Sequence, residues 1–85
     1  MYPVLCNRTY EINIESVEDR TVGSQRQLVV TGWAIDKMRH EPLELTATCE
    51  GAEMKVDRIP RSDLEPVFGL SEGSRSGYRV LLPMD

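Results

Sequence analysis

The sequence has few of the residues that carry catalytic or redox chemistry, and it has no long apolar run. Its 85 residues include one histidine, two cysteines, one tryptophan and one phenylalanine. No apolar stretch approaches the roughly 20 residues of a membrane-spanning helix, and the first residues lack the basic and then apolar pattern of a signal peptide. Acidic residues outnumber basic ones by fourteen to ten. Since nucleic-acid binding needs clustered Lys and Arg, we expect no nucleic-acid partner and no direct membrane insertion.

The two cysteines, Cys6 and Cys49, are too few for a disulfide framework and form no Cys-x-x-Cys motif. The sequence leaves open whether they form one bridge or remain as thiols. Because no export signal is recognised, we expect free thiols in a reducing compartment, with Cys49 as a small inward-facing hydrophobe.

Catalytic and metal-binding patterns are absent or incomplete. His40 lies with Asp36 in a polar loop, but that segment supplies no third metal ligand and no group to orient an acid–base pair, so we expect a solvated loop histidine. The chain lacks a Gly-x-Ser-x-Gly elbow, a glycine-rich phosphate loop and the Asp-x-Asp pair that many nucleotide-sugar enzymes use to hold a cation. We expect no catalytic residue, metal or cofactor in this domain. A small independent hydrolase is the least favoured alternative.

The sequence does contain a series of short strand patterns. From Gln27 to Asp36 both alternating faces are largely apolar, which predicts a central strand covered on two sides, with Gly32 marking a bulge or a close backbone approach. Four further segments alternate apolar and polar residues with period two, as half-buried strands do. They are residues 10–15, 43–50, 54–59 and 78–82.

Turn residues separate these strands. We expect turns at 18–20 and 23–24, a hairpin loop over 36–42, a mobile polar loop over 71–77 and an end to the last strand at Pro83. Ser62 and Glu65 have the spacing of a capping box, which predicts a short helical turn that Gly69 ends.

Five strands at close spacing without a long helix predict an all-β domain. The expected architecture is a small antiparallel β-sandwich or partly open barrel with one short helical turn. We expect residues 1–9 to form a flexible lead-in and residues 10–85 a single β-sandwich module, part of a longer protein. Loops on a rigid sheet carry most recognition, so we expect any binding at 36–42 and 71–77.

The aromatic residues have two interpretations. An exposed indole is a common platform for sugars, because its apolar face stacks on pyranose C–H groups. Trp33, however, lies in the middle of the most apolar segment. We therefore expect Trp33, together with Phe68 and Tyr78, to belong to the core.

Two arginines and an aspartate, Arg58, Arg61 and Asp63, flank Pro60. A guanidinium and a carboxylate this close in sequence often tie a loop together through paired hydrogen bonds, which is the favoured interpretation. The alternative is a contact with an anion or a sugar hydroxyl at one end of the sandwich.

Three segments, taken in order, resemble a known family. They are Val30-Thr31-Gly32-Trp33-Ala34-Ile35-Asp36; Arg61-Ser62-Asp63-Leu64 followed by Phe68-Gly69-Leu70; and Gly77-Tyr78-Arg79-Val80. The order is similar to that of an accessory β-sandwich domain in bacterial, mainly Gram-positive, glycosyltransferases that build cell-surface polysaccharides such as rhamnose-rich polymers (family 2-like, rhamnan-synthesis type). That domain shows Gly-Trp-Ala-x-Asp, then Arg-x-Asp-Val/Leu, then Gly-Phe.

The resemblance covers residues 10–82. The matching positions are Trp33, Asp36, Arg61, Asp63 and Gly77, whereas Tyr78 replaces the usual phenylalanine and Leu64 the usual valine. We name Trp33, Asp36, Arg61, Asp63 and Tyr78 as the candidate binding or structural corner.

The resemblance implies a non-catalytic accessory module that positions a glycan or docks a catalytic domain. Its implied partners are the catalytic glycosyltransferase domain of the same chain and a cell-wall oligosaccharide. The implied location is cytoplasmic, with the parent protein able to hold the module at the inner face of the membrane. The alternative is a purely structural or protein-interaction β-sandwich module with no sugar affinity.

Overall fold

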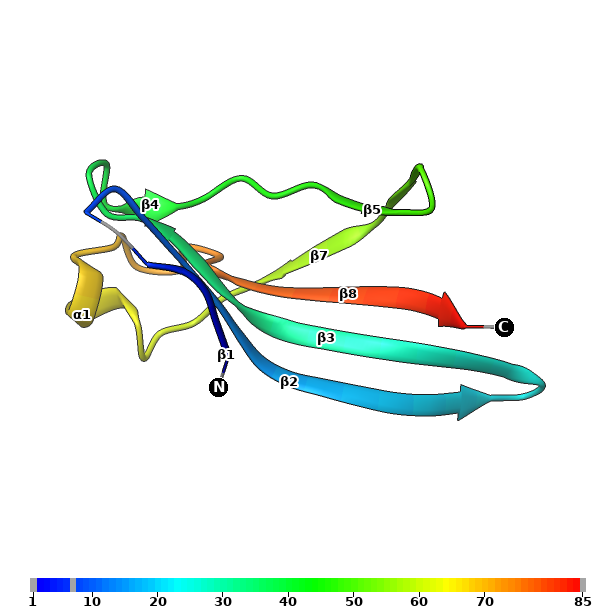
Figure 1. Ribbon diagram of the computed structural model, residues 1–85. Coiled ribbons are helices and arrows are strands. Elements are labelled where there is room, and N and C mark those ends of the chain that lie inside the picture. Colours follow the sequence, from blue (N-terminus) through cyan, green and yellow to red (C-terminus); the bar gives the residue numbers. More distant parts are fainter. Residues whose placement is uncertain (1, 7, 85) are drawn as a thin grey trace.

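The computed structural model describes residues 2–6 and 8–84, and their fold is all-β (Figure 1). The strands are β1 (Tyr2–Cys6), β2 (Tyr10–Val22), β3 (Gln25–Asp36), β4 (Glu41–Pro42), β5 (Ala47–Cys49), β6 (Ala52–Met54), β7 (Val56–Ile59) and β8 (Gly77–Met84). The described residues include one helix, α1 (Glu65–Phe68), and their strands form no closed barrel. The predicted all-β class is therefore confirmed.

The main sheet is antiparallel, with the strand order β1-β2-β3-β8-β7 and β4 added beside the end of β3. Strand β3 lies at its centre: β2 pairs with it from Val22↔Gln25 to Tyr10↔Asp36, and β8 pairs with its other edge. The β5–β6 hairpin is a separate two-stranded sheet. Figure 1 shows the chain from β4 through β5 running above β3 and β8, as a thin second layer.

From Val29 to Asp36 both faces of β3 are buried or half-buried, as the two apolar faces of this segment predict. On one face Trp33 and Ile35 pack with Leu64 and Leu70 from the segment around α1, and Phe68 packs against this cluster. On the other face the buried residues are Ala34, Tyr78 and Val80. They are covered by partly buried side chains from both layers: Ile12, Val30, Leu43, Leu45, Ala47, Met54, Val56 and Leu82.

Two expectations at the strand ends are wrong. Residues 18–20 form no turn, because β2 continues to Val22 and pairs with β3 along this whole stretch. The turn falls at 23–24 alone, where Gly23 adopts φ 63°. Pro83 does not end β8 but lies within it, opposite Gln27, at a position with no strand of the described residues on its outer side.

The covering layer is less regular than its alternating sequence predicts. Within 43–50 only Ala47–Cys49 is a strand, and Pro42 belongs to β4 instead of the loop. Leu43 and Leu45 still pack on the sheet face. The inward direction of alternate side chains therefore persists outside the strands, because burial of apolar side chains is favourable without a regular strand.

The N-terminal segment and the start of the helix also differ from expectation. The lead-in 1–9 includes β1, which pairs with β2. Helix α1 has Leu64 as its N-cap and no side-chain cap, so the capping box at Ser62 does not form. The Glu65 carboxylate instead accepts a bond from the Gly73 amide at 3.1 Å. Gly69 ends the helix in the left-handed conformation, as predicted.

Of the two cysteines, the structure describes one thiol. Cys49 is half-buried and free. The Cys6 side chain lies outside what the structure describes.

Candidate functional site

Gly32 lies where two strands approach each other closely. The register of β2 against β3 shifts between Ile14 and Ser16, next to the Ile14↔Gly32 pair. A Cβ at Gly32 would lie 1.9 Å from the Asn13 carbonyl oxygen and 2.7 Å from the Tyr78 hydroxyl. The close backbone approach predicted for this glycine is therefore present, and it leaves room for a buried hydrogen bond from Tyr78 to the Asn13 carbonyl at 2.8 Å.

Arg61 is the centre of a structural corner. Its Nε and Nη2 donate to the two Asp63 oxygens at 2.9 and 2.8 Å, and its guanidinium also pairs with Glu15, the residue at the register shift of β2. The hydrogen bonds to Asp63 and Glu15 raise the pKa of Arg61, and the bond from Arg61 lowers the pKa of Asp63. The predicted arginine–aspartate pair is present and fastens the loop before α1 to β2.

The hydrogen bonds of Arg58 go to backbone carbonyls and not to Asp63, its neighbour in the sequence. It donates to three backbone carbonyls, those of Leu43 at 2.7 Å, Gly77 at 3.1 Å and Ser76 at 3.4 Å. Burial lowers the pKa of Arg58. Because its hydrogen bonds go to main-chain oxygens on both sides, Arg58 ties the covering layer at Leu43 to the start of β8.

The motifs that carry the family resemblance converge in space. Trp33 lies opposite Gly77 and Gly32 opposite Tyr78 across β3 and β8, while Leu64 belongs to the Trp33 cluster. Trp33 and Tyr78 are each only 6% exposed, so neither ring offers a face to a sugar. Burial, with a smaller effect from the Glu15 carboxylate, raises the pKa of Tyr78. Four of the five named site residues thus form the interior and its corner.

Asp36, the fifth, organises the turn between β3 and β4. One carboxylate oxygen accepts the amides of Met38 and Arg39, both at 3.1 Å, and the other lies 3.9 Å from Arg39 Nε. His40 adopts φ 56° and donates from Nδ1 to the Phe68 carbonyl at 3.0 Å. The histidine is exposed, but it docks the turn onto α1 and is not simply solvated. Among the described residues, no group of three His, Cys, Asp or Glu side chains could hold a metal ion.

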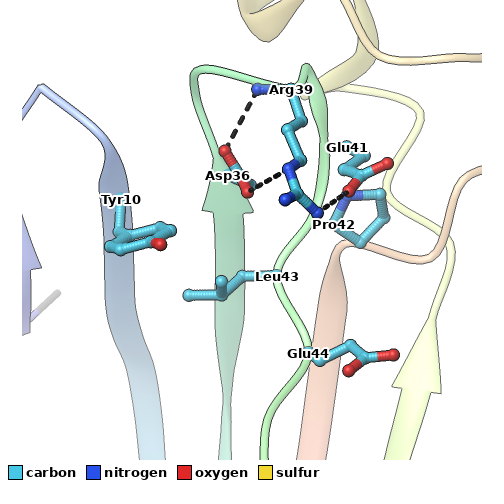
Figure 2. Close-up of a pocket in the computed structure, with 7 residues that line it drawn as sticks. All are labelled: Tyr10, Asp36, Arg39, Glu41, Pro42, Leu43 and Glu44. Carbon is cyan, nitrogen blue, oxygen red and sulfur yellow. Dashed lines mark hydrogen bonds and ion pairs between the residues drawn. The ribbon is translucent and has the colours of Figure 1, made fainter.

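Beside this turn lies a half-open hollow of about 590 Å³. Its walls come from the start of β2, the end of β3 and the segment after the turn (Figure 2). The lining residues are Tyr10, Asp36, Arg39, Glu41, Pro42, Leu43 and Glu44. Figure 2 shows Arg39 between Asp36 and Glu41, with Nη1 lying 3.8 Å from the Glu41 carboxylate.

Three residues of this hollow, Tyr10, Leu43 and Glu44, lie outside the expected recognition loop 36–42, and Tyr10 is the one farthest from it in the sequence. It is 37% exposed and pairs with Asp36 across β2 and β3. Its place at the first position of an alternating strand looks like that of any inward-facing residue. Only the pairing with the last residue of β3 brings its ring to the expected recognition loop 36–42. The second expected loop, 71–77, contributes nothing to the hollow.

No family model, no curated protein and no solved structure matches this chain. None of the helices in the described part of the chain is long and apolar enough to cross a membrane.

Proposed function

We propose that this domain is a non-catalytic accessory module of a bacterial glycosyltransferase and that it positions a neutral, hydroxyl-rich glycan. The observation that carries the proposal is the hollow beside Asp36. It combines an exposed tyrosine ring, three carboxylates and one guanidinium at the end of a rigid sheet. Its volume of about 590 Å³ is in the range of small-molecule sites.

The chemistry of the lining suits sugar hydroxyls. The Tyr10 ring supplies an apolar face for pyranose C–H groups. The carboxylates of Glu41 and Glu44 accept hydrogen bonds from hydroxyl groups, and Arg39 donates them. Since carboxylates outnumber the single guanidinium in the lining, an anionic polymer is repelled and a neutral glycan is preferred.

The assignment to a glycosyltransferase rests on the resemblance of the three motifs. What supports it is that these motifs meet at one corner, which is how residues that define a fold are expected to lie. In this proposal the catalytic domain of the same chain holds the nucleotide sugar. The module then contributes glycan placement without a reaction of its own.

A second candidate is a protein-interaction module without sugar affinity. It is favoured by an apolar groove of about 200 Å³ on the sheet face under the covering layer. Ile14, Leu45 and Val56 are among its lining residues. A groove of this kind accepts an apolar side chain from a docked domain, and with Thr46 and Tyr78 as its only hydroxyl-bearing lining residues it offers a sugar few hydrogen bonds.

Isothermal titration with neutral, rhamnose-containing cell-wall oligosaccharides tests the first candidate. We expect saturable binding to the wild type that is weakened about five- to thirtyfold by Tyr10→Ala or Arg39→Ala, since each removes a contact worth about 1–2 kcal/mol. Arg75→Ala, which removes the same charge from the other expected loop, should bind like the wild type. No heat at millimolar sugar, or equal affinity of all variants, would reject glycan binding at this hollow and favour the second candidate.

A further inference from the structure

The longest open strand edge of the described residues is the second half of β2. β1 pairs with β2 only between Glu11 and Ile14, so residues 16–22 have β3 on one side and, within residues 2–6 and 8–84, no strand on the other. β7 is only four residues long, and the open end of β8 contains Pro83, which has no amide to donate. A long unpaired edge is a template for strand addition.

The hairpin turn determines which backbone groups point outward from this edge. β2 and β3 are joined by the two residues Gly23 and Ser24, with Val22 opposite Gln25. The residues flanking a two-residue turn exchange backbone hydrogen bonds, and bonded and non-bonded pairs then alternate along the ladder. The amides and carbonyls of residues 18 and 20 therefore point to β3, and those of residues 17, 19 and 21 point outward.

The charges on this edge select one register for a two-fold antiparallel pair. A pair centred on residue 18 would place Glu18 opposite its own copy, and one centred on residue 20 would do the same with Arg20. Centring on Asp19 places Glu18 opposite Arg20 of the second copy, twice by symmetry. It also gives the full overlap of residues 16–22. Opposite charges directly across a ladder are favourable, and like charges are not.

The remaining contacts in that register are compatible with pairing. Val17 would lie opposite Thr21, a β-branched pair. Asp19 would face its copy, but each Asp19 carboxylate already accepts bonds from Arg26 of its own chain at 2.9 and 3.0 Å. Glu18 and Arg20 are exposed and have no ion-pair partner among the described residues, so their charges are available to a second copy.

We propose that residues 16–22 form a self-complementary edge through which two copies of this chain associate antiparallel, centred on Asp19. The second copy is the occupant because the sequence Glu18-Asp19-Arg20 is its own charge complement in one register only. A seven-residue edge buries less than the roughly 1,200–2,000 Å² of a standard interface. The association is accordingly weak and depends on protein concentration. It uses the edge of the sheet away from the glycan hollow, so it stands or falls independently of sugar binding.

Sedimentation equilibrium from micromolar to millimolar concentration tests this. We expect a reversible monomer–dimer equilibrium, weakened at least about tenfold by Glu18→Arg or by Arg20→Glu, because each reversal creates two like-charged pairs. The double variant Glu18→Arg/Arg20→Glu should dimerise like the wild type. An equimolar mixture of the two single variants should form a mixed dimer, since the charges are again opposite.

Amide hydrogen exchange gives an independent signature, and urea unfolding midpoints within error of the wild type show that all variants fold. At high concentration we expect added protection at Val17, Asp19 and Thr21 and little change at residues 18 and 20. A strictly monomeric protein at millimolar concentration would overturn the proposal. So would single reversals without effect, or a double variant that fails to recover the dimer.

Discussion

At Gly32 the fold requires a residue without a side chain. Its missing side chain lets the Asn13 carbonyl and the Tyr78 hydroxyl meet across the sheet at 2.8 Å. The sequence predicted a close approach here because a glycine interrupts an otherwise apolar strand. It gave no sign of which groups approach, since Asn13 and Tyr78 come from distant strands that the topology brings together.

Substitution of this glycine should be costly. In Gly32→Ala the new methyl group overlaps the Asn13 carbonyl oxygen, so backbone must shift. We expect the free energy of unfolding to fall by about 1–3 kcal/mol or more, measured by urea unfolding. Gly73→Ala is the matched control: its φ is 78° but nothing lies within 4 Å of the new Cβ, so only the backbone strain of about 1 kcal/mol remains. Equal losses in both variants would refute the close-approach account.

At the scale of elements, the loop before α1 is held to the sheet by charge. Arg61 joins Asp63 on its own loop to Glu15 on β2, next to Gly77 at the start of β8. A Cβ at Gly77 would lie 2.9 Å from the Arg61 side chain. The corner therefore depends on the missing side chain of Gly77 as well as on ion pairs.

Because of the Arg61–Asp63 pair, the free energy of unfolding should fall as the pH becomes acidic. Because the folded protein lowers the pKa of Asp63, its contribution is fully present above the usual aspartate value of about 4 and is lost as pH falls through the lowered value. We expect Asp63→Asn to flatten part of the loss of urea stability below about pH 4. The pKa of Asp19 is lowered by Arg26 in the same way, so some acid dependence should remain.

Glu72→Gln is the control for this prediction, because it removes an exposed carboxylate that has no partner among the described residues. The urea stability of Glu72→Gln should change with pH as that of the wild type does. If the urea stability of Asp63→Asn also changes with pH as that of the wild type does, the Arg61–Asp63 pair does not contribute to stability.

The sequence predicted the central elements well and the edges poorly, for a physical reason. From Val29 to Asp36 both faces of β3 are buried or half-buried, so hydrophobic pattern and structure coincide there. The outer half of β2 is exposed on both faces, and its Glu18-Asp19-Arg20 sequence looks like a turn because no burial marks it as a strand. Pairing with β3 alone makes it one.

The candidate site follows the same logic. Any binding was predicted at loops 36–42 and 71–77; the first forms one wall of the hollow and the second contributes nothing to it. Tyr10 was not predicted, because its role depends on the register between β2 and β3. Conversely, Trp33 and Tyr78 carry the most distinctive motifs and prove to be interior.

At the scale of the whole molecule, the protein is an elongated sheet with a compact end. Its extents are 43 × 24 × 20 Å and its radius of gyration is 13.8 Å, against about 12 Å for a compact chain of this length. The β2–β3 hairpin extends away from α1 and the β4 turn (Figure 1). Hence the hollow beside Asp36 and the open edge of β2 occupy different parts of the molecule.

We propose that recognition belongs to the hollow beside Asp36 and that the motif residues Trp33, Arg61 and Tyr78 are structural supports for it. The direct measurement is an amide NMR titration of the whole domain with neutral, rhamnose-containing oligosaccharides. We predict saturable shifts at Tyr10, Arg39, Glu41 and Glu44, with the Trp33 indole resonance unchanged. Flat spectra at millimolar sugar, or shifts centred on Trp33 and Arg61, would contradict the account.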